Sequence, residues 1–179
     1  MGGVAGAGLL DQRMVGAVVM GKPSRDKGKR REQQAAQLVR EWVGPEWDVS
    51  RNARNAQKGP HTAGDLCVER AGHWFPYCIE VKGHASFCPS LLWRPGGGFL
   101  FGKWASQALE QADSCGREAL LMMKPDRRPW LVAAPFYESA RFGLCMTVET
   151  ECGPWLVTTW ERFTECGRWS PPKEERWRR

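Results

Sequence analysis

The stretch from Gly64 to Lys82 constrains the fold of this chain more than any other part of the sequence. Two runs rich in Val, Ile, Phe and Tyr, Leu66–Arg70 and Phe75–Lys82, flank the turn-prone segment Ala71–Trp74. This pattern predicts a β-hairpin. One face of the hairpin is apolar, which indicates that it belongs to a buried sheet. The apolar positions are Leu66, Val68, Tyr77, Ile79 and Val81.

The opposite face of the predicted hairpin is polar. Counting outward from the turn places Cys67 opposite Cys78 and Asp65 opposite Glu80, with Lys82 on the same side because side chains alternate along a strand. Opposed side chains lie about 4.5–5.5 Å apart at Cβ. Two ionised carboxylates at that separation repel unless a cation lies between them. The pattern indicates either a cation site or a solvated polar face, and the apolar character of the other face favours the site.

Length and composition bound the class of protein. The chain has 179 residues, of which 42% are apolar, and it contains ten Trp; these values predict one folded domain with a hydrophobic core. The net charge of +6 favours a polyanionic partner. The Gly/Ala/Val-rich segment Met1–Met20 is broken by Asp11 and Arg13, and it lacks the pattern of a signal peptide or membrane span. We therefore expect a cytoplasmic protein with a flexible leader over residues 1–23.

The pattern of the seven cysteines also favours a cytoplasmic protein. Their number is odd, none stands in a C-x-x-C pair, and no secretory signal precedes them. Reduced thiols are therefore expected. A zinc site formed by Cys67, His73 and Cys78 is the alternative that the spacing allows, and it is the weaker interpretation.

A helix is predicted over Ser24–Val43, because its apolar residues repeat at helical spacing and Gly44-Pro45 follows. Extending the apolar stripe back by one turn reaches Glu32. Burying an unpaired charge is costly. Glu32 is therefore expected either to reach solvent at the first turn, where a negative charge suits the helix dipole, or to join the polar face of the hairpin.

Basic residues surround the start of this helix, where cations are mildly destabilising, so we expect them to bind an outside partner such as DNA phosphates. They are Lys22, Arg25, Lys27, Lys29, Arg30 and Arg31. A basic loop over Arg51–Ala63, with Arg54 and Lys58, leads to Asp65 and is predicted to face DNA. His61 and His84 are either phosphate contacts or ordinary surface residues.

The remaining elements complete an α/β fold: a mixed central β-sheet flanked by helices in a single domain. They are a strand at Trp47–Arg51, a loop or flap at Phe87–Leu100, a helix at Lys103–Cys115 with Gln107 and Gln111 beside its apolar side, a second hairpin from Ala119–Met123 and Trp130–Ala134, and a strand or docked extension at Trp155–Trp160. The folded domain is expected over residues 24–165, followed by a flexible basic C-terminal tail over residues 166–179.

The polar face suits metal-assisted phosphodiester hydrolysis. Mg²⁺ prefers carboxylate oxygens, retains water and accepts phosphate as a further ligand. The ion polarises the phosphoryl oxygen and lowers the pKa of a bound water. Lys82 is placed to orient the attacking water and to balance charge on the phosphate. Asp65, Glu80 and the carbonyl of Val81 are the expected ligands, and Glu32 is expected to reach the same place.

These residues carry a resemblance. Asp65 followed by Glu80-Val81-Lys82 resembles the PD-(D/E)XK nuclease superfamily, in which such residues form the metal site. The segment Lys27-Gly28-Lys29-Arg30-Arg31-Glu32 resembles the K-G-x-x-x-E start of archaeal-type Holliday-junction resolvases. The resemblance covers Ser24–Phe136 and implies a restriction-endonuclease-like core. It departs from the superfamily at Gly64, where proline is common.

The resemblance also implies the residues and partners of a nuclease. Its catalytic residues would be Glu32, Asp65, Glu80, Lys82 and Gln107, with Mg²⁺ as the metal and Mn²⁺ as a substitute. DNA, four-way or branched, would be the partner, and the chain would be a homodimer, in host cytoplasm if it is phage-encoded. The residues expected to bind DNA are Lys27, Lys29, Arg30, Arg31, Arg51, Arg54 and Lys58.

Three hypotheses therefore remain. The first is a metal-dependent, structure-selective DNA endonuclease, with junction resolution as its expected activity. The second is another nuclease of the superfamily, restriction-like or end-processing. The third is a DNA-binding protein without catalytic activity.

Overall fold

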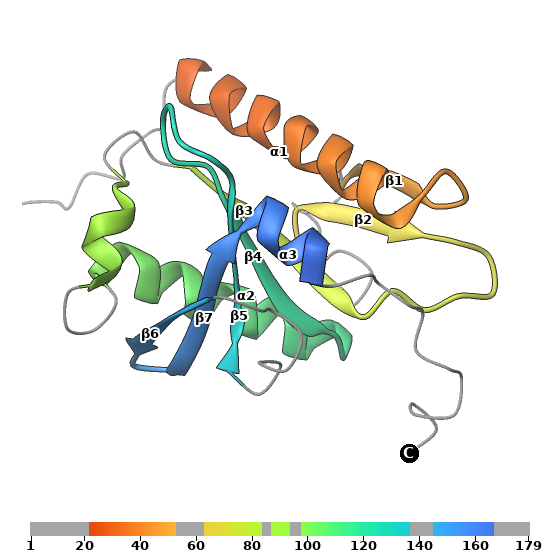
Figure 1. The fold of residues 1–179 in the computed structure, drawn as a ribbon. Helices are drawn as coiled ribbons and strands as arrows, with labels where there is room; N and C mark the ends of the chain where they lie inside the picture. The colour runs from red at the N-terminus through yellow and green to blue at the C-terminus, as the bar shows by residue number, and fades with distance from the viewer. Residues whose placement is uncertain (1–21, 53–62, 84–86, 94–97, 137–144, 167–179) are drawn as a thin grey trace, which may run out of the picture.

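A five-stranded mixed sheet lies between two layers of helix in the computed structural model of this chain, which describes residues 22–52, 63–83, 87–93, 98–136 and 145–166 (Figure 1). Its elements, in chain order, are α1 (Lys22–Val43), β1 (Asp48–Arg51), β2 (Leu66–Glu69), β3 (Tyr77–Lys82), the short 3₁₀-helix η1 (Pro89–Trp93), α2 (Phe99–Cys115), β4 (Glu118–Met123), β5 (Leu131–Pro135), β6 (Met146–Thr150), β7 (Gly153–Thr159) and α3 (Trp160–Cys166). The α/β fold with a mixed central sheet flanked by helices is thus confirmed.

The strand order of the sheet is β3-β4-β5-β7-β6. Only β3 and β4 run parallel, and α2 forms the crossover between them. The other neighbours are antiparallel. A parallel pair needs such a long connection, whereas β4 and β5 are joined by a short turn, as the sequence predicts for this second hairpin.

The pairing predicted for the first hairpin is wrong. β2 pairs antiparallel with β1 in a separate two-stranded sheet, with Arg51 opposite Leu66. β3 instead pairs with β4, with Lys82 opposite Met123. A single backbone hydrogen bond, from Asp65 N to Ile79 O at 2.8 Å, holds the start of β2 against β3. The physical reason is that β3 is covered on both faces and gains a full parallel partner through the α2 crossover.

The sheet separates two apolar cores, because successive side chains of each strand point to opposite faces. In β4, Leu120 and Met122 join the core beneath α1 and α3, whereas Leu121 and Met123 join the core beneath α2. All five residues of the predicted apolar hairpin face are buried in the first of these cores. Removing a side chain of this size from water contributes about 1.5–3 kcal/mol. The two cores therefore fix the sheet between α1 and α2.

Several other predicted elements are confirmed. The first helix and the strand after it are α1 and β1, and the strand near the C-terminal end is β7. α2 begins at Phe99 rather than Lys103. β6 and α3 were not predicted. Residues 1–21, the loop residues Arg54, Lys58 and His61, His84, and residues 167–179 lie outside the described residues. Among the described helices, none has the length and apolar character needed to cross a membrane.

All seven cysteines are free. Cys67, His73 and Cys78 have different surroundings in the described structure: Cys67 Sγ donates a hydrogen bond to Glu69, His73 Nδ1 contacts Ala71 O, and Cys78 is buried in the core beneath α2. Among the described residues, they are not grouped as the alternative zinc site requires.

Candidate active site

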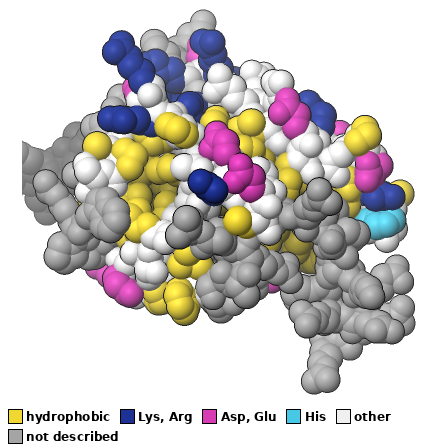
Figure 2. Space-filling view, in the orientation of Figure 1, with side chains coloured by type: hydrophobic (Ala, Val, Ile, Leu, Met, Phe, Trp, Pro, Cys, Tyr) yellow, Lys and Arg dark blue, Asp and Glu magenta, His cyan; other side chains and the backbone are white. Residues whose placement is uncertain are grey.

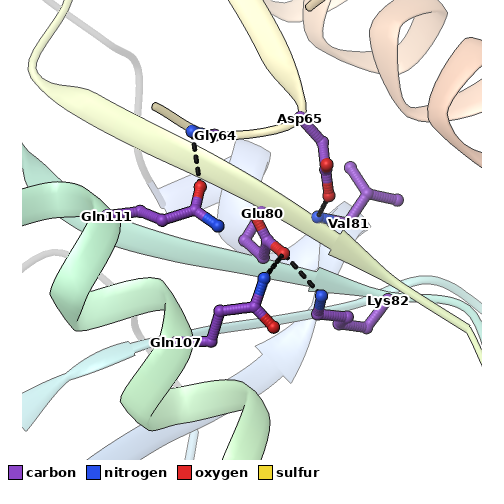
Figure 3. Close-up of polar contacts among 7 residues, drawn as sticks. All are labelled: Gly64, Asp65, Glu80, Val81, Lys82, Gln107 and Gln111. Carbon is purple, nitrogen blue, oxygen red and sulfur yellow. Dashed lines mark hydrogen bonds and ion pairs between the residues drawn. The ribbon is translucent and has the colours of Figure 1, made fainter. Parts of the chain in front are cut away.

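Asp65 is fixed at the start of β2 by two hydrogen bonds to β3. Its backbone N–H donates to Ile79 O at 2.8 Å. Its Oδ2 accepts from the backbone N–H of Val81, also at 2.8 Å (Figure 3). The side chain thus occupies the position of a strand partner at the edge of β3. This brings Asp65 beside Glu80, although β2 and β3 are not neighbours in one sheet.

Gly64 permits this approach. Its φ is +78°, and an added Cβ would lie 2.9 Å from Ile79 O. Its N–H donates to Gln111 Oε1 at 2.6 Å (Figure 3). Proline, the common residue here in the superfamily that the sequence resembles, has no N–H and a φ near −65°. Proline at this position would lose the hydrogen bond to Gln111 and could not adopt the observed φ.

Glu80 is the most deeply buried charged residue described, with 1% of its surface exposed. Its Oε1 accepts hydrogen bonds from Lys82 Nζ at 2.5 Å and from Gln107 Nε2 at 2.8 Å (Figure 3). Its Oε2 is buried and has no hydrogen-bond partner among the described residues. A buried carboxylate oxygen without a partner is costly. One oxygen of Glu80 therefore remains available for a cation.

The pKa of Asp65 depends on its burial and on the three charged residues near it, Glu32, Glu80 and Lys82. The pKa of Asp65 is raised from its ordinary 3.8 to about 7, chiefly because the carboxyl group is buried. The charge of Glu80 and, to a smaller extent, that of Glu32 also raise this pKa, whereas the N–H of Val81 and the charge of Lys82 lower it. Each of these residues acts on the same carboxyl group. The site thus concentrates more negative charge than its own lysine balances.

Glu32 comes to this site from α1. Its Oε2 accepts a hydrogen bond from Arg51 Nε at 2.6 Å, and about a quarter of its side chain is exposed. Glu32 is therefore half-buried and paired, rather than extended into solvent at the first turn. The structure brings Glu32, Asp65, Glu80 and Lys82 to one region, with Gln107 bonded to Glu80.

These residues fit a divalent cation, even though the described residues hold no ready-made cluster of three ligands. Carboxylate oxygens are hard donors. Glu80 Oε2 lacks a partner among the described residues, and the pKa of Asp65 is raised first by burial and then by the charge of Glu80, both of which a bound cation would offset. Val81 contributes its N–H to Asp65, and the use of its carbonyl as a ligand stays a prediction.

The predicted DNA-binding residues divide into two groups. Lys27, Lys29 and Arg30 are exposed on the first turns of α1, where Figure 2 shows Lys and Arg side chains gathered. Arg31 and Arg51 are instead held within the protein, Arg31 by Gly83 O and Asp126, and Arg51 by Glu32.

Gln111 is a site residue that the sequence analysis missed. It lies one helical turn after Gln107 on α2, so both side chains point to the same side of the helix. Gln107 donates a hydrogen bond to Glu80, and Gln111 accepts one from the N–H of Gly64, the residue before Asp65. The i, i+4 spacing of the two glutamines was the signal that could have identified it.

Comparisons with known proteins identify relatives of this chain. The profile of the family described as “Phage putative PDDEXK endonuclease” matches residues 23–167, which is 145 of 179 residues. Protein D14 of Escherichia phage T5 is 32% identical over 116 residues, covering 64% of this chain and 72% of that protein. The solved structure of Hjc from Archaeoglobus fulgidus, described as a Holliday junction resolvase, matches with 18% identity and a TM-score of 0.37. The match covers 75% of this chain and 88% of the Hjc chain.

Proposed function

Because this chain belongs to the family described as phage PDDEXK endonucleases, we propose that it is a divalent-metal-dependent DNA endonuclease whose active site is formed by Asp65, Glu80 and Lys82. The observation that carries the proposal is the buried Glu80 carboxylate. One of its oxygens is held by Lys82, and the other has no partner among the described residues. A buried anion in that state is costly unless it serves a ligand.

Asp65 and Glu80 would hold the metal, with Glu32 and the carbonyl of Val81 as further ligands. When bound, Mg²⁺ supplies Lewis acidity at the phosphate and lowers the pKa of a water. Mg²⁺ is preferred because the donors are carboxylates, and Mn²⁺ accepts the same ligands.

The other side chains have distinct tasks in this proposal. Lys82 faces the same carboxylate that holds the ion, so its ammonium group can balance the charge that develops on the phosphate and orient the attacking water. Gln107 donates to the same Glu80 oxygen and limits the rotation of that carboxylate. Gln107 is therefore a positioning residue rather than a group that touches substrate.

Branched DNA, with junction resolution as the reaction, is the substrate we propose. Two features support it: the Lys27-to-Glu32 segment resembles the start of junction resolvases, and Glu32 on α1 acts electrostatically on Asp65. Paired nicks across a four-way junction require two active sites related by a twofold axis, so we propose a homodimer. Similarity to a phage T5 protein supports action in the host cytoplasm.

The test is a cleavage assay with Mg²⁺ on a synthetic four-way junction and on linear duplex of the same sequence, with Asp65→Asn as the control. Paired nicks in the junction, with duplex left intact, are expected. Equal cutting of both substrates would instead favour restriction-like or end-processing activity. Binding without cutting by the wild-type chain would favour the DNA-binding protein without catalytic activity.

A further inference from the structure

The turn between β4 and β5 lies against the start of α1, although 95 residues separate them in sequence. Arg31 Nη2 of α1 forms an ion pair with Asp126 Oδ1 of the turn at 2.8 Å. Arg31 Nη1 donates to Gly83 O, directly after Lys82. One arginine therefore joins α1, the end of β3 and the β4–β5 turn.

This turn carries positive charge that nothing in the described structure balances. Arg127 and Arg128 are exposed, and neither forms an ion pair with a described acidic residue. The only acid of the turn, Asp126, is paired with Arg31. The preceding Lys124 adds a third positive charge, and its ammonium group donates to Arg128 O and lies over the Trp130 ring. Like charges this close repel one another, so the turn holds them at a cost.

The backbone adds to that cost. Arg127 has a φ of 56°, and it is the only described non-glycine residue with a positive φ. This left-handed conformation favours Gly or Asn, and other residues adopt it at a cost of about 1 kcal/mol or more. An arginine at the position where a turn would favour glycine indicates that its side chain serves a purpose beyond folding.

The turn begins beside the candidate active site. The N–H of Lys124 donates to Lys82 O at 2.9 Å, and Met123 is the strand partner of Lys82. Arg127 lies four residues beyond Met123, which limits their separation to about 13 Å even in an extended chain. Nucleotides of one DNA strand rise about 3.4 Å each. The turn therefore begins one strand spacing, about 5 Å, from Lys82 and extends at most about 13 Å beyond Met123, which places it a few nucleotide steps from a phosphate bound at Lys82.

We propose that the basic turn, Lys124–Arg128, forms with the exposed Lys27, Lys29 and Arg30 of α1 a surface that binds DNA phosphates on one side of the scissile phosphate. Arg31 fixes the two halves of this surface and is not itself a phosphate contact. The inference rests on the proposed DNA endonuclease function and adds residues that the sequence motifs did not indicate. Figure 2 shows basic side chains gathered over this region.

The first test replaces both turn arginines, with Arg127→Asn chosen because Asn tolerates a left-handed backbone, and Arg128→Gln. Binding to a short fluorescein-labelled duplex is measured in EDTA between about 50 and 200 mM salt. Loss of two phosphate contacts should weaken binding by about tenfold or more and lower the slope of log K against log salt by about 1.8. The charge-matched control is Arg70→Gln with Arg162→Gln, for which the slope should be unchanged.

The second test changes the DNA rather than the protein and is read first on the wild-type chain. Methylphosphonates, which are neutral, replace single phosphates within a few steps of the mapped cleavage position. Wild-type binding should weaken at particular phosphates on one side, and the Arg127→Asn/Arg128→Gln variant should show no further loss there.

The outcomes separate the two proposals. If the turn variant binds DNA and responds to salt like the control, the proposed phosphate-binding surface is wrong. Cleavage by the wild-type chain would still support the endonuclease proposal. A wild-type chain that does not cut DNA in Mg²⁺ overturns the proposed endonuclease function, whether or not it binds DNA.

Discussion

The carboxylate of Asp65 accepts a hydrogen bond from the backbone N–H of Val81 at 2.8 Å, between two strands that are not neighbours in one sheet. This contact places Asp65 beside the residues that flank Val81, which are Glu80 and Lys82. Holding the two carboxyl groups close together in a buried place costs free energy. Burial and the charge of Glu80 accordingly raise the pKa of Asp65 to about 7. The site therefore uses a side chain, rather than a strand ladder, to bring its acids together.

Replacing Asp65 should separate activity from binding. Asp65→Asn keeps a carbonyl oxygen for the Val81 N–H but removes the negative charge. Metal-dependent cleavage should fall by at least about 100-fold, the range seen when a single electrostatic group is removed from an active site. DNA affinity should not decrease, because one repulsive charge is lost. The control is Asp48→Asn, on the exposed face of β1. Equal cleavage by Asp65→Asn and wild type contradicts the assignment.

The stability of the metal-free protein should depend on Asp65. The folded-state pKa of about 7 lies above the ordinary 3.8, so the folded protein holds this proton more tightly than the unfolded chain does. Well below pH 3.8 the carboxyl group is protonated in both states, and the stabilisation from that proton is lost as pH rises from about 4 through 7. In EDTA, the Tm of wild type should fall across this window relative to that of Asp65→Asn. Parallel curves for the two proteins would show that the Asp65 carboxyl is not perturbed.

Gly64 should tolerate no side chain. A residue with Cβ at φ +78° is strained by about 1–2 kcal/mol, and here its Cβ would also lie 2.9 Å from Ile79 O. Gly72 provides the matched control, because its φ is +72° and nothing lies within 4 Å of an added Cβ. Gly64→Ala should lower the free energy of unfolding by at least about 1 kcal/mol more than Gly72→Ala. Urea denaturation measures both, and equal losses would show that no close contact is present.

Gln111 should act on cleavage through Asp65. Gln111→Met preserves the length of the side chain but leaves the Gly64 N–H without its acceptor. Groups that orient ligands typically change metal affinity or activity by about 10–100-fold. We therefore expect weaker Mn²⁺ binding together with slower cleavage, whereas Gln34→Met, on the exposed side of α1, should change neither. Reduced stability with unchanged Mn²⁺ affinity would mean that Gln111 has only a structural role.

The fold class was predictable because its signals are local. The apolar repeat of α1 and the turn between β4 and β5 depend on residues close in sequence, and both formed as predicted. β3 was assigned the wrong partner because a short turn between two apolar runs also suits a hairpin. Its pairing with β4 depends on the α2 crossover, which is a long-range feature. The run Tyr77–Val81 is buried at every position, and such a pattern favours a parallel strand over an alternating hairpin strand.

The charged residues of the candidate site could be singled out from the sequence, and the residues that position them could not. Asp65, Glu80 and Lys82 stand out because they are charges beside or within apolar strand-like runs, and their roles in catalysis stay a prediction. Gln111 and Asp126 are ordinary polar residues whose role depends on contacts across 47 and 95 positions. The turn arginines likewise gain meaning only when Arg31 places them beside α1. Residue chemistry indicates the reaction, whereas the contacts that position the reacting groups require the fold.

The central claim, that Asp65 and Glu80 share one divalent ion, is tested most directly by Mn²⁺ binding measured with calorimetry on wild type, Asp65→Asn and Glu80→Gln. We predict one ion per chain in the wild-type protein, and weaker binding by at least about tenfold in each variant. Binding of equal affinity in all three proteins, or no binding by wild type in the presence of DNA, would contradict the account.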